Sequence, residues 1–445
     1  MKKIFTIAVS AVIIFSMTAN CFAMELLKRG KRGDDVREIQ EMLISQGYLD
    51  DRADGVFGRK TEQAVLAFQK DHDLDETGIV GTGTYNALKN GAAEQGAETA
   101  QDGKTSGGEI DYAETFPSWN PESASLGELA AFVSACTDKS NPDYLEPADR
   151  IAVFDMDGTI LCEKAPVYID YCLTMYRVLD DPTYNATEEE RDSMEQIREH
   201  AYTEGETFHP EGLCKADLVA SAFAGMTPEE FRSYVVDFAD NTDVVGFSGM
   251  TYGQSFYKPM IEVISYLKAN DFDVWMVSAC EREVVRALVE RYDIPYDHVI
   301  ATDVPYVASG KGEEVADEYN MEKDEEILLG TPLAEVECGK SGKPAGIIRE
   351  IGKRPVLAFG NSSGDYSMVN YAEGNPEHTG MGFFVVCDDT EREYGSEEKA
   401  AEYNEVVEKE GWTGISMAND WKTIYGEGVE KTELPGVEEE LDNAA

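Results

Sequence analysis

The sequence is poor in positive charge. Its 445 residues include 38 Lys and Arg but 87 Asp and Glu, for a formal net charge of −49 at pH 7. Without a basic excess, a chain gains little by displacing the counterions of a polyanion, so nucleic acid is excluded as the expected partner. Most of the acids lie in residues 91–445, which hold 26 bases and 74 acids. This part either uses a metal or local cations to handle an anionic substrate, or carries its acids only for solubility.

Long apolar runs are missing beyond the N-terminus. There, Lys2 and Lys3 precede an apolar run over residues 4–19, and Cys21-Phe22-Ala23 offers a cleavage site between small residues. This pattern predicts a signal peptide over residues 1–23 and a mature chain without a membrane span. The protein is therefore expected to be secreted and extracellular or cell-wall-associated, or periplasmic if its source has an outer membrane.

Cysteine and histidine are also scarce. Cleavage after Ala23 would leave seven of the eight cysteines, an odd number over more than 400 residues, which argues against a disulfide scaffold. The cysteine spacings match no zinc pattern, and the five histidines are scattered along the chain. Several cysteines stand in apolar stretches, where this residue is usually a small buried hydrophobe.

Residues 24–90 are predicted to form a small three-helix module. Apolar positions recur at helical spacing over 36–43 and again over 61–68, and a third short helix is expected near Thr84–Lys89. Asp54-Gly55 and Gly58 mark the turn between the first two helices. The order of Gly33, Val36, Gln40, Leu43, Gly47-Tyr48, Asp54-Gly55, Phe57-Gly58, Thr61, Ala64-Val65, Phe68-Gln69, Gly78, Val80-Gly81 and Thr84 resembles the peptidoglycan-binding module of bacterial wall enzymes. That resemblance implies peptidoglycan as a partner; the alternative is a module kept for folding or protein contacts.

The rest of the chain reads as a linker followed by one large α/β domain. Residues 91–111 are rich in small and polar residues and predict a flexible linker. Over 112–428, short apolar strand-like runs alternate with helical patterns, which is typical of a Rossmann-like, doubly wound parallel sheet. Residues from about 163 to 255 form a long helical insertion between the first two strands, expected as a cap. The remaining residues, 429–445, are predicted to be an acidic, frayed tail.

Two carboxylates, Asp155 and Asp157, directly follow the first predicted strand, in the sequence Asp155-Met-Asp157-Gly-Thr159. Ligands of open α/β sheets gather at the carboxyl ends of strands. One carboxylate can attack phosphorus while the other protonates the leaving oxygen, so the pair suits phosphoryl transfer. Thr159 is expected to hold the turn after the pair by hydrogen bonding. A calcium-binding or solvated acidic turn is the alternative.

Three further segments offer groups for the same edge of the sheet. Ser278 and the backbone N–H of Ala279 end the second strand, before a predicted helix, and could bind phosphate oxygens. Asn361 and Asp365 follow another strand-like run and offer the oxygen ligands that Mg²⁺ prefers. Lys343 could neutralise a phosphate, although surface lysines are common and two others lie nearby.

Together these segments resemble the haloacid dehalogenase-like hydrolase superfamily, mainly its phosphatases related to phosphoserine and phosphorylcholine phosphatase. The resemblance implies that Asp155 forms an aspartyl-phosphate, that Asp157 is the general acid and base, and that Ser278 and Lys343 hold phosphoryl oxygens. It also implies Mg²⁺ bound by Asp155, the Asp157 carbonyl and the Asn361–Asp365 motif. Glu163 stands near the place where phosphoserine phosphatases direct an acid toward the substrate amine.

Asn361 departs from the family pattern, which usually has Asp there. An amide oxygen can ligate a hard cation but brings no charge, so a weakened enzyme or a pure binding protein is the main alternative. Cleavage of phosphonate or carbon–halogen bonds is a second, which the presence of Asp157 disfavours. The expected substrate is a small phosphorylated metabolite; aromatic residues in the cap could cage an amine-bearing one, or simply form the cap's own core.

Overall fold

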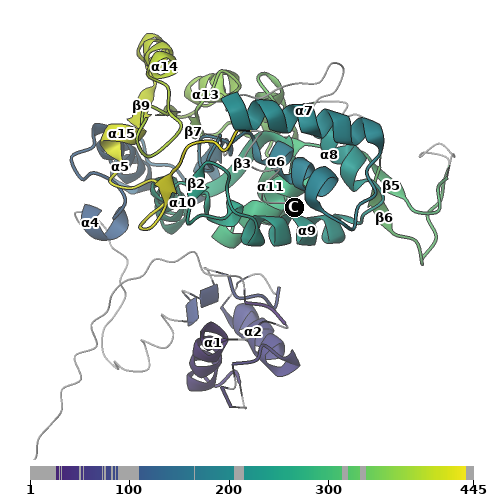
Figure 1. Ribbon diagram of the computed structural model, residues 1–445. Coiled ribbons are helices and arrows are strands. Elements are labelled where there is room, and N and C mark those ends of the chain that lie inside the picture. The colour runs from purple at the N-terminus through teal and green to yellow at the C-terminus, as the bar shows by residue number, and fades with distance from the viewer. Residues whose placement is uncertain are drawn as a thin grey trace, which may run out of the picture. The chain divides into compact units, whose positions relative to one another are not determined.

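The computed structural model (Figure 1) divides into two units, Met1–Ala92 and Ala93–Ala445. It describes residues 27–29, 31, 33–49, 52–53, 55–72, 74, 77–81, 84–85, 87–88, 110–164, 166–204, 215–312, 319–330 and 337–436. The predicted signal peptide, residues 91–109 of the predicted linker, Cys214 and residues 437–445 lie outside the described residues. No helix within the described ranges is long and apolar enough to cross a membrane.

The N-terminal unit contains the predicted helices. Helix α1 spans Asp34–Ser45 and α2 spans Arg59–Asp71, and the described residues between 84 and 88 are helical. The residues predicted to share one face of each helix are buried: Val36, Ile39, Gln40, Leu43, Thr61, Ala64, Val65 and Phe68. Because the apolar stripe of each helix packs against the other, the periodicity seen in the sequence becomes a core that no single helix could form alone.

Two buried glutamines organise the turns of this unit in the same way. The side chain of Gln40 accepts from the N–H of Gly55 at 2.8 Å and donates to Thr61 Oγ1 at 3.1 Å. One helix later, Gln69 accepts from the N–H of Gly78 at 2.8 Å and donates to Thr84 Oγ1 at 3.0 Å. Each glutamine thus ties its helix to a glycine turn and to a threonine of the helical segment that follows.

The C-terminal unit is built on one six-stranded parallel sheet, which confirms the predicted Rossmann-like fold. The strand order is β4-β3-β1-β7-β8-β9, and every neighbouring pair in it is parallel. The strands are β1 (Ile151–Phe154), β3 (Asp273–Glu281), β4 (Val299–Thr302), β7 (Leu357–Gly360), β8 (Met381–Val386) and β9 (Thr413–Ser416).

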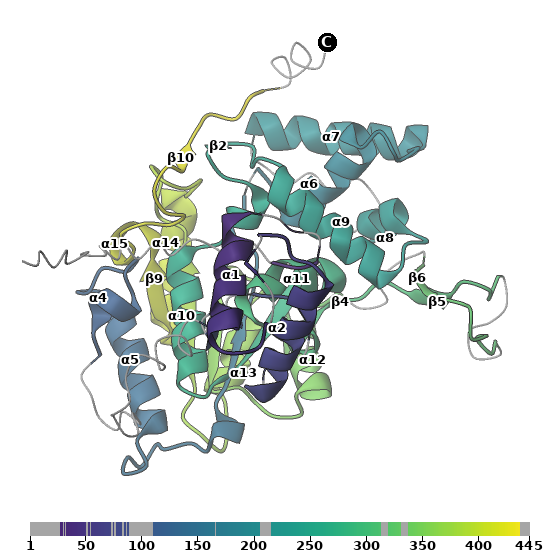
Figure 2. The same cartoon turned by 90° about the horizontal axis from the view of Figure 1, so that it is seen from below.

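Both faces of this sheet are covered by helices. In β1, Ile151 and Val153 pack into one hydrophobic cluster, whereas Ala152 and Phe154 pack into another, as the alternation of side chains along a strand requires. One face packs against α5 (Ala124–Thr137), α10 (Lys258–Ala269) and α11 (Arg282–Val289), and the other against α12 (Gly342–Glu350), α13 (Tyr366–Glu373) and α14 (Glu397–Glu410) (Figure 2).

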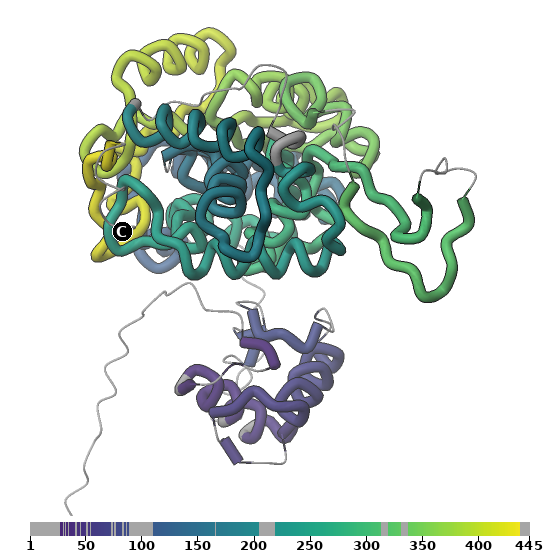
Figure 3. The backbone as a smooth tube through the Cα atoms, turned by 45° about the vertical axis from the view of Figure 1, so that its right-hand side comes forward, coloured from purple at the N-terminus to yellow at the C-terminus, as the bar shows by residue number. Residues whose placement is uncertain are grey.

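The predicted cap is a group of helices inserted after β1. It comprises α6 (Ile169–Met175), the π-helical segment η2 (Tyr176–Asp180), α7 (Glu188–Glu204), α8 (Lys215–Phe223) and α9 (Pro228–Asn241). A short strand, β2 (Phe247–Ser248), and the turn η3 (Tyr252–Gln254) lead back to the core. The tube in Figure 3 shows these helices lying together on one side of the unit.

Smaller elements complete the unit. Between β4 and α12 in the sequence, β5 (Tyr306–Ala308) and β6 (Ile327–Leu329) form a hairpin. The hairpin projects from the body of the unit (Figures 1 and 3). The remaining elements are α4 (Tyr112–Thr115), η1 (Pro147–Asp149), η4 (Glu290–Tyr292), η5 (Tyr296–His298), α15 (Met417–Asp420) and β10 (Glu430–Lys431). Strand β10 corrects the prediction of a tail from residue 429, because it pairs antiparallel with β2.

Candidate active site

The candidate site lies where three neighbouring strands end. From β1 the chain builds outward through β3 and β4, and then returns to the other side of β1 to build β7, β8 and β9. The strand order therefore reverses at β1, and such a switch point is where open α/β sheets bind ligands. The segments that follow β1 and β7, together with the last residues of β3, supply the predicted site residues.

A buried lysine joins these three strands. The Nζ of Lys343 lies 2.5 Å from Asp155 Oδ1, 2.6 Å from Asp365 Oδ1 and 2.7 Å from the carbonyl oxygen of Val277. Only 2% of its surface is exposed. Burial alone would lower its pKa, but the charges of Asp155 and Asp365 outweigh that effect and raise it, so the ammonium stays charged.

Asp155 is held from two sides. Lys343 contacts Oδ1, and the hydroxyl of Thr159 donates to Oδ2 at 3.3 Å. Burial, with a smaller contribution from the charge of Asp365, raises the pKa of Asp155 to about 7, and Lys343 opposes this rise. A nearby cation would favour the ionised carboxylate, which is the form that can act as a nucleophile.

The turn after Asp155 brings Asn361 against the first motif. The Oδ1 atom of Asn361 lies 3.4 Å from the hydroxyl of Thr159. Gly158 has a φ of +80°, and a Cβ there would lie 1.9 Å from the Nδ2 atom of Asn361, so only glycine fits this position. Asp157 lies in the same turn with 8% of its surface exposed. Asp155, Asp157, Thr159 and Asn361 are thus brought together as the sequence indicated.

Glu163 explains why an amide suits position 361. The side-chain amide of Asn361 hydrogen-bonds Glu163, and the hydroxyl of Tyr168 lies 3.4 Å from Glu163 Oε1. Burial raises the pKa of Glu163, while Lys164, Lys399 and the bond to Asn361 lower it. An aspartate at 361 would place a carboxylate against both Asp155 and Glu163, whereas asparagine offers its oxygen to one side and its N–H to the other. Nothing in the sequence alone indicates this contact.

The segment with Ser278 differs from its prediction. Strand β3 continues to Glu281, and helix α11 begins only at Arg282, capped by Glu281. Ser278 is therefore not at a helix start: it is fully buried, and its hydroxyl accepts from the N–H of Cys280 at 3.1 Å. The carbonyl of Ala279 accepts from Thr302 Oγ1 at 2.9 Å. The extended segment still brings Ser278 beside the Val277 carbonyl that Lys343 contacts.

Asp365 has a different position from the other predicted metal ligands. Its Oδ1 contacts Lys343, and its Oδ2 accepts from the backbone N–H groups of Asn361 and Ser362, each at 3.0 Å. Both oxygens therefore already have partners that fix the loop after β7. Asp155, Asp157 and Asn361 supply carboxylate, carbonyl and amide oxygens after β1 and β7, and oxygen donors of this kind fit Mg²⁺. Within the described ranges, no group of three or more His, Cys, Asp or Glu side chains is arranged for a metal ion.

The cap's aromatic residues form its interior. Tyr171, Phe223, Tyr252 and Phe256 are each at most 4% exposed. The guanidinium of Arg177 lies over the rings of three aromatic residues, at 4.5 Å from Tyr184, 5.0 Å from Tyr234 and 5.5 Å from Phe223. In these positions the rings pack the cap and hold one of the chain's own cations. Phe208, another predicted cage residue, lies outside the described residues.

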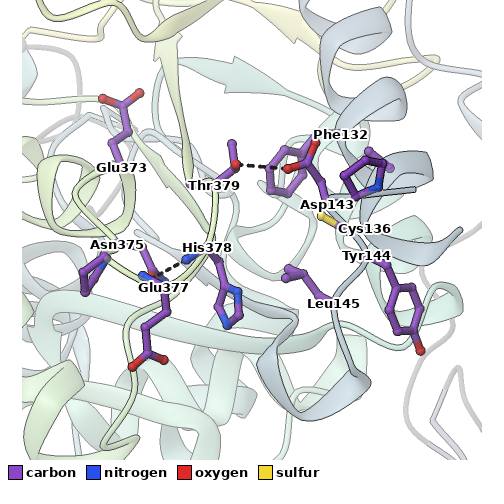
Figure 4. Close-up of a pocket in the computed structure, with 14 residues that line it drawn as sticks. Phe132, Cys136, Asp143, Tyr144, Leu145, Glu373, Asn375, Glu377, His378 and Thr379 are labelled. Atoms are coloured by element: carbon purple, nitrogen blue, oxygen red, sulfur yellow. Dashed lines mark hydrogen bonds between the residues drawn. The ribbon is translucent and has the colours of Figure 1, made fainter. Parts of the chain in front are cut away.

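A hollow of about 530 Å³ lies near the end of the sheet where the strands begin, opposite the candidate active site (Figure 4). It is lined by residues 142–145, after α5, and by residues 375–380, which precede β8. Its carboxylates are Asp143 and Glu377, which come from loops, and Glu373, at the end of α13; Asp143 accepts from Thr379 Oγ1 at 3.4 Å. None of the predicted site residues lines it, so its size does not mark the predicted chemistry.

Comparison with known families matches each unit to one family. Residues 152–369 match the haloacid dehalogenase-like hydrolases, and residues 32–88 match the putative peptidoglycan binding domain. The chain thus carries a haloacid dehalogenase-like hydrolase domain. The matched residues include the whole constellation from Asp155 to Asp365, and the N-terminal match covers the two buried glutamines.

Among the curated relatives are spore cortex-lytic enzymes, which match a short part of this chain. Over 72 residues, or 16% of this chain, it is 40% identical to the spore cortex-lytic enzyme of Bacillus subtilis (strain 168), of which the match covers 24%. The spore cortex-lytic enzyme of Bacillus cereus is 34% identical over 84 residues, 19% of this chain and 32% of that enzyme. The chain therefore spans about a quarter to a third of the length of these relatives.

Solved structures resemble the hydrolase unit at low identity. A conserved protein of unknown function from Anaerococcus prevotii DSM 20548 is 15% identical with a TM-score of 0.43, covering 67% of this chain and 92% of that one. A phosphoserine phosphohydrolase-like protein from Francisella tularensis subsp. tularensis SCHU S4 is 14% identical with a TM-score of 0.30, covering 53% and 87%.

Proposed function

We propose that this chain is a secreted, cell-wall-associated phosphatase that hydrolyses small phosphate monoesters through an aspartyl-phosphate at Asp155. The observation that best supports this is the buried contact of Lys343 with Asp155 and Asp365, at 2.5 and 2.6 Å. A buried lysine beside a carboxylate at the end of a central strand supplies the charge that a phosphoryl group needs in an otherwise acidic protein.

In the first step, a carboxylate oxygen of Asp155 attacks phosphorus and the bond from phosphorus to the ester oxygen breaks. Asp157 gives its proton to the departing alcohol. In the second step, Asp157 takes a proton from water, which attacks the phosphorus of the aspartyl-phosphate and releases phosphate. Lys343 and Ser278 hold the phosphoryl oxygens, and Thr159 orients Asp155 through its hydrogen bond.

Asp155, the carbonyl of Asp157 and the amide oxygen of Asn361 would hold Mg²⁺, which supplies charge for the phosphoryl oxygens when bound. Asp365 serves mainly to position Lys343 and the loop after β7, because both of its oxygens are engaged there. Glu163, at the start of the cap, would face the leaving group. An amine-bearing phosphate is the substrate class that this acid favours.

The proposed wall association rests on the N-terminal unit. Its match to the peptidoglycan binding domain supports peptidoglycan as the partner, and residues 91–111 would be the linker to the hydrolase domain. A fragment of residues 24–90 is expected to co-sediment with isolated cell walls, whereas a peptide of residues 91–111 stays in solution. Equal recovery of the two would contradict the anchoring role.

The second candidate is a hydrolase fold that binds its ligand without turnover. The neutral side chain of Asn361 is its support, because it removes a charge from the proposed metal ligands. An assay with an aryl phosphate separates the two. We expect hydrolysis that requires Mg²⁺ and stops with chelator. Asp155→Asn should lower kcat by roughly 10⁴-fold or more, because a neutral amide cannot replace the carboxylate as the nucleophile that forms the acyl phosphate.

Asp271→Asn is the matched control, since its side chain is 74% exposed and lies outside the site. It should keep full activity. If the protein binds phosphate compounds but releases no phosphate under any metal condition, the binding protein is the better description. If Asp155→Asn retains turnover, the nucleophile has been assigned to the wrong residue.

A further inference from the structure

The cap is joined to the core by two chain segments that lie side by side. The segment that leaves the core after β1, here called the outgoing linker, pairs with the segment that returns from the cap to the core. The two are joined by the antiparallel bridge between Leu161 and Phe256. Two backbone hydrogen bonds hold them: Cys162 N–H to Ser255 O at 2.9 Å and Tyr257 N–H to Ile160 O at 2.8 Å. Two adjacent linkers of this kind form a hinge, about which an inserted group of helices can move as one body.

Besides the linkers, α9 of the cap contacts the core through the ion pairs of Arg232 with Glu283 and of Asp240 with Arg291, each at 3.1 Å. A further connection between cap and core comes from the C-terminal segment. Residues 429–436, here called the strap, leave the core and run along the cap (Figure 2). Within the strap, β10 pairs with β2 of the cap, with Lys431 opposite Phe247 and Glu430 opposite Ser248. Beyond β10, the N–H of Thr432 donates to Gly246 O at 2.9 Å, and the N–H of Gly436 donates to Tyr202 O, at the end of α7, at 3.3 Å.

The strap is anchored to the core through one loop. The Nζ of Lys431 donates to the carbonyls of Thr390 and Glu393, each at 2.9 Å, and lies 4.6 Å from the centre of the Tyr394 ring. The hydroxyl of Tyr394 in turn lies 2.9 Å from Gly246 O in the cap and 2.6 Å from Thr432 O in the strap. Core, strap and cap therefore meet at a single tyrosine.

The same loop also reaches the hinge. The carboxylate of Glu393 is 2% exposed, and it accepts hydrogen bonds from Tyr425 and from the N–H of Tyr394, the latter at 2.7 Å. The thiol of Cys162, in the outgoing linker, lies 3.7 Å from it. Movement of the loop at 390–394 is thereby coupled both to the strap and to a linker residue next to Glu163.

Two glycines in the cap allow the close approach of these segments. Gly246 has a φ of +90°, and a Cβ there would lie 2.4 Å from the hydroxyl of Tyr394. Gly249 has a φ of +71°, and its Cβ would lie 2.5 Å from the carbonyl oxygen of Gly428. The turn around β2 is thus shaped to receive the strap, and any side chain at either glycine would push it away.

We propose that the strap is a latch: it holds the cap closed over the candidate active site, and it detaches from β2 each time the cap opens to admit substrate or release product. The effect on turnover rests on the proposed phosphatase function, whereas the latch itself does not. Its contacts are a pair of two-residue strands, a few backbone hydrogen bonds, the hydroxyl of Tyr394 and one lysine. A set of contacts this small can open on the timescale of catalysis.

Two truncations test the latch independently of activity. A chain ending at Gly428 lacks the strap, and a chain ending at Gly436 keeps the strap and lacks only the residues after it. In the first, amide exchange should become about tenfold faster or more at 199–204 and 243–251 and stay unchanged in β1, β7 and β8. The second should exchange like the full chain. Unchanged exchange in both, or equal loosening of the core strands, would overturn the proposal.

A cross-link tests whether the latch must open. Ser248 and Glu430 are exposed partners in the β2–β10 pair, so Ser248→Cys with Glu430→Cys can form a disulfide across it. The oxidised protein should lose at least about tenfold in kcat on an aryl phosphate, and reductant should restore it. Equal kcat in both states would overturn the latch. If no form of the protein, uncrosslinked chain included, hydrolyses phosphate esters, the proposed function fails while the exchange experiment still decides on the latch.

Discussion

The two units bury polar groups in opposite ways. In the N-terminal unit the buried groups are the neutral amides of Gln40 and Gln69, and each satisfies a glycine turn and a threonine hydroxyl. In the hydrolase unit they also include charged groups, since Lys343 lies between Asp155 and Asp365. A neutral network is stable by itself and specifies a fold. A buried ion triad is costly by comparison, and it is retained where its charges meet a reacting group.

The largest expected effect comes from removing the cation of the triad. Lys343→Met leaves the two buried carboxylates Asp155 and Asp365 without their cation, so the free energy of unfolding should fall by about 3–5 kcal/mol at pH 8. Activity should be lost as well. Chemical denaturation and the aryl phosphate assay measure the two effects. The control is Lys340→Met, at an exposed position three residues earlier, which should leave stability and activity unchanged. A Lys343→Met protein as stable as the parent would contradict the contrast between a neutral buried network in one unit and a buried ion triad in the other.

A buried acid without a cationic partner sharpens the comparison. Burial raises the pKa of Glu281 from 4.5 to about 8. The native state therefore binds this proton more tightly than the unfolded chain, and stability should fall as the pH rises from about 4.5 to about 8. Glu281→Gln keeps an oxygen to cap Val284 and should be more stable than the parent by roughly 2–4 kcal/mol at pH 8, with little difference at pH 4.5.

Denaturation at a series of pH values measures this slope. The exposed Glu290 supplies the control, because Glu290→Gln should keep the parent's pH dependence. A Glu281→Gln protein with the same slope as the parent would show that Glu281 titrates normally.

The neutral network is expected to cost less to break. Gln69→Leu removes the partners of Gly78 N–H, Ile79 O and Thr84 Oγ1, and should lower the stability of the N-terminal unit by about 2–3 kcal/mol. Gln63→Leu, on the exposed side of the same helix, is the matched control. Calorimetry should show a shift in one transition only, with phosphatase activity unchanged; a loss of activity would contradict the separation of roles.

The smallest effect is expected at the residue that departs from the family pattern. Asn361→Asp adds a charge to the proposed metal ligands, and half-maximal activation should need roughly tenfold less Mg²⁺. In chelator the same variant should be slightly less stable, because the new carboxylate faces Asp155 and Glu163. Glu163→Gln combined with Asn361→Asp should relieve that loss. Titration of activity with Mg²⁺ checks the first effect, and an unchanged midpoint would show that position 361 does not contact the metal.

The sequence predicted the parts of the fold that carry strong patterns. The sequence predicts strands in the apolar runs of β1, β7 and β8 and in residues 274–277, the apolar part of β3. β4 and β9, the two edge strands of the sheet, are not among the strands that the sequence predicts, and β9 contains Gly414 and is half-buried, which weakens its apolar pattern. The β2–β10 pair was missed for a related reason, since two-residue strands leave no periodicity to detect.

The site could be predicted where a residue directly follows a segment that the sequence identifies as a strand. Asp155, Asp157 and Asp365 follow strands, so their convergence could be expected from the parallel sheet alone. The contact of Lys343 with Val277 O, the bond between Asn361 and Glu163, and the extension of β3 past Ser278 depend on tertiary packing. They could not be inferred from the sequence, and they change the expected surroundings of Ser278 and the expected role of Asp365 most.

The most direct test of the central claim is to trap the phosphorylated enzyme. The protein is mixed with an aryl phosphate and Mg²⁺, quenched in acid within one turnover, and digested for mass spectrometry. The account predicts one phosphoryl group on the peptide containing Asp155, and none in Asp155→Asn under the same conditions. Phosphate released at full rate with no labelled peptide, or a label on any other residue, would contradict it.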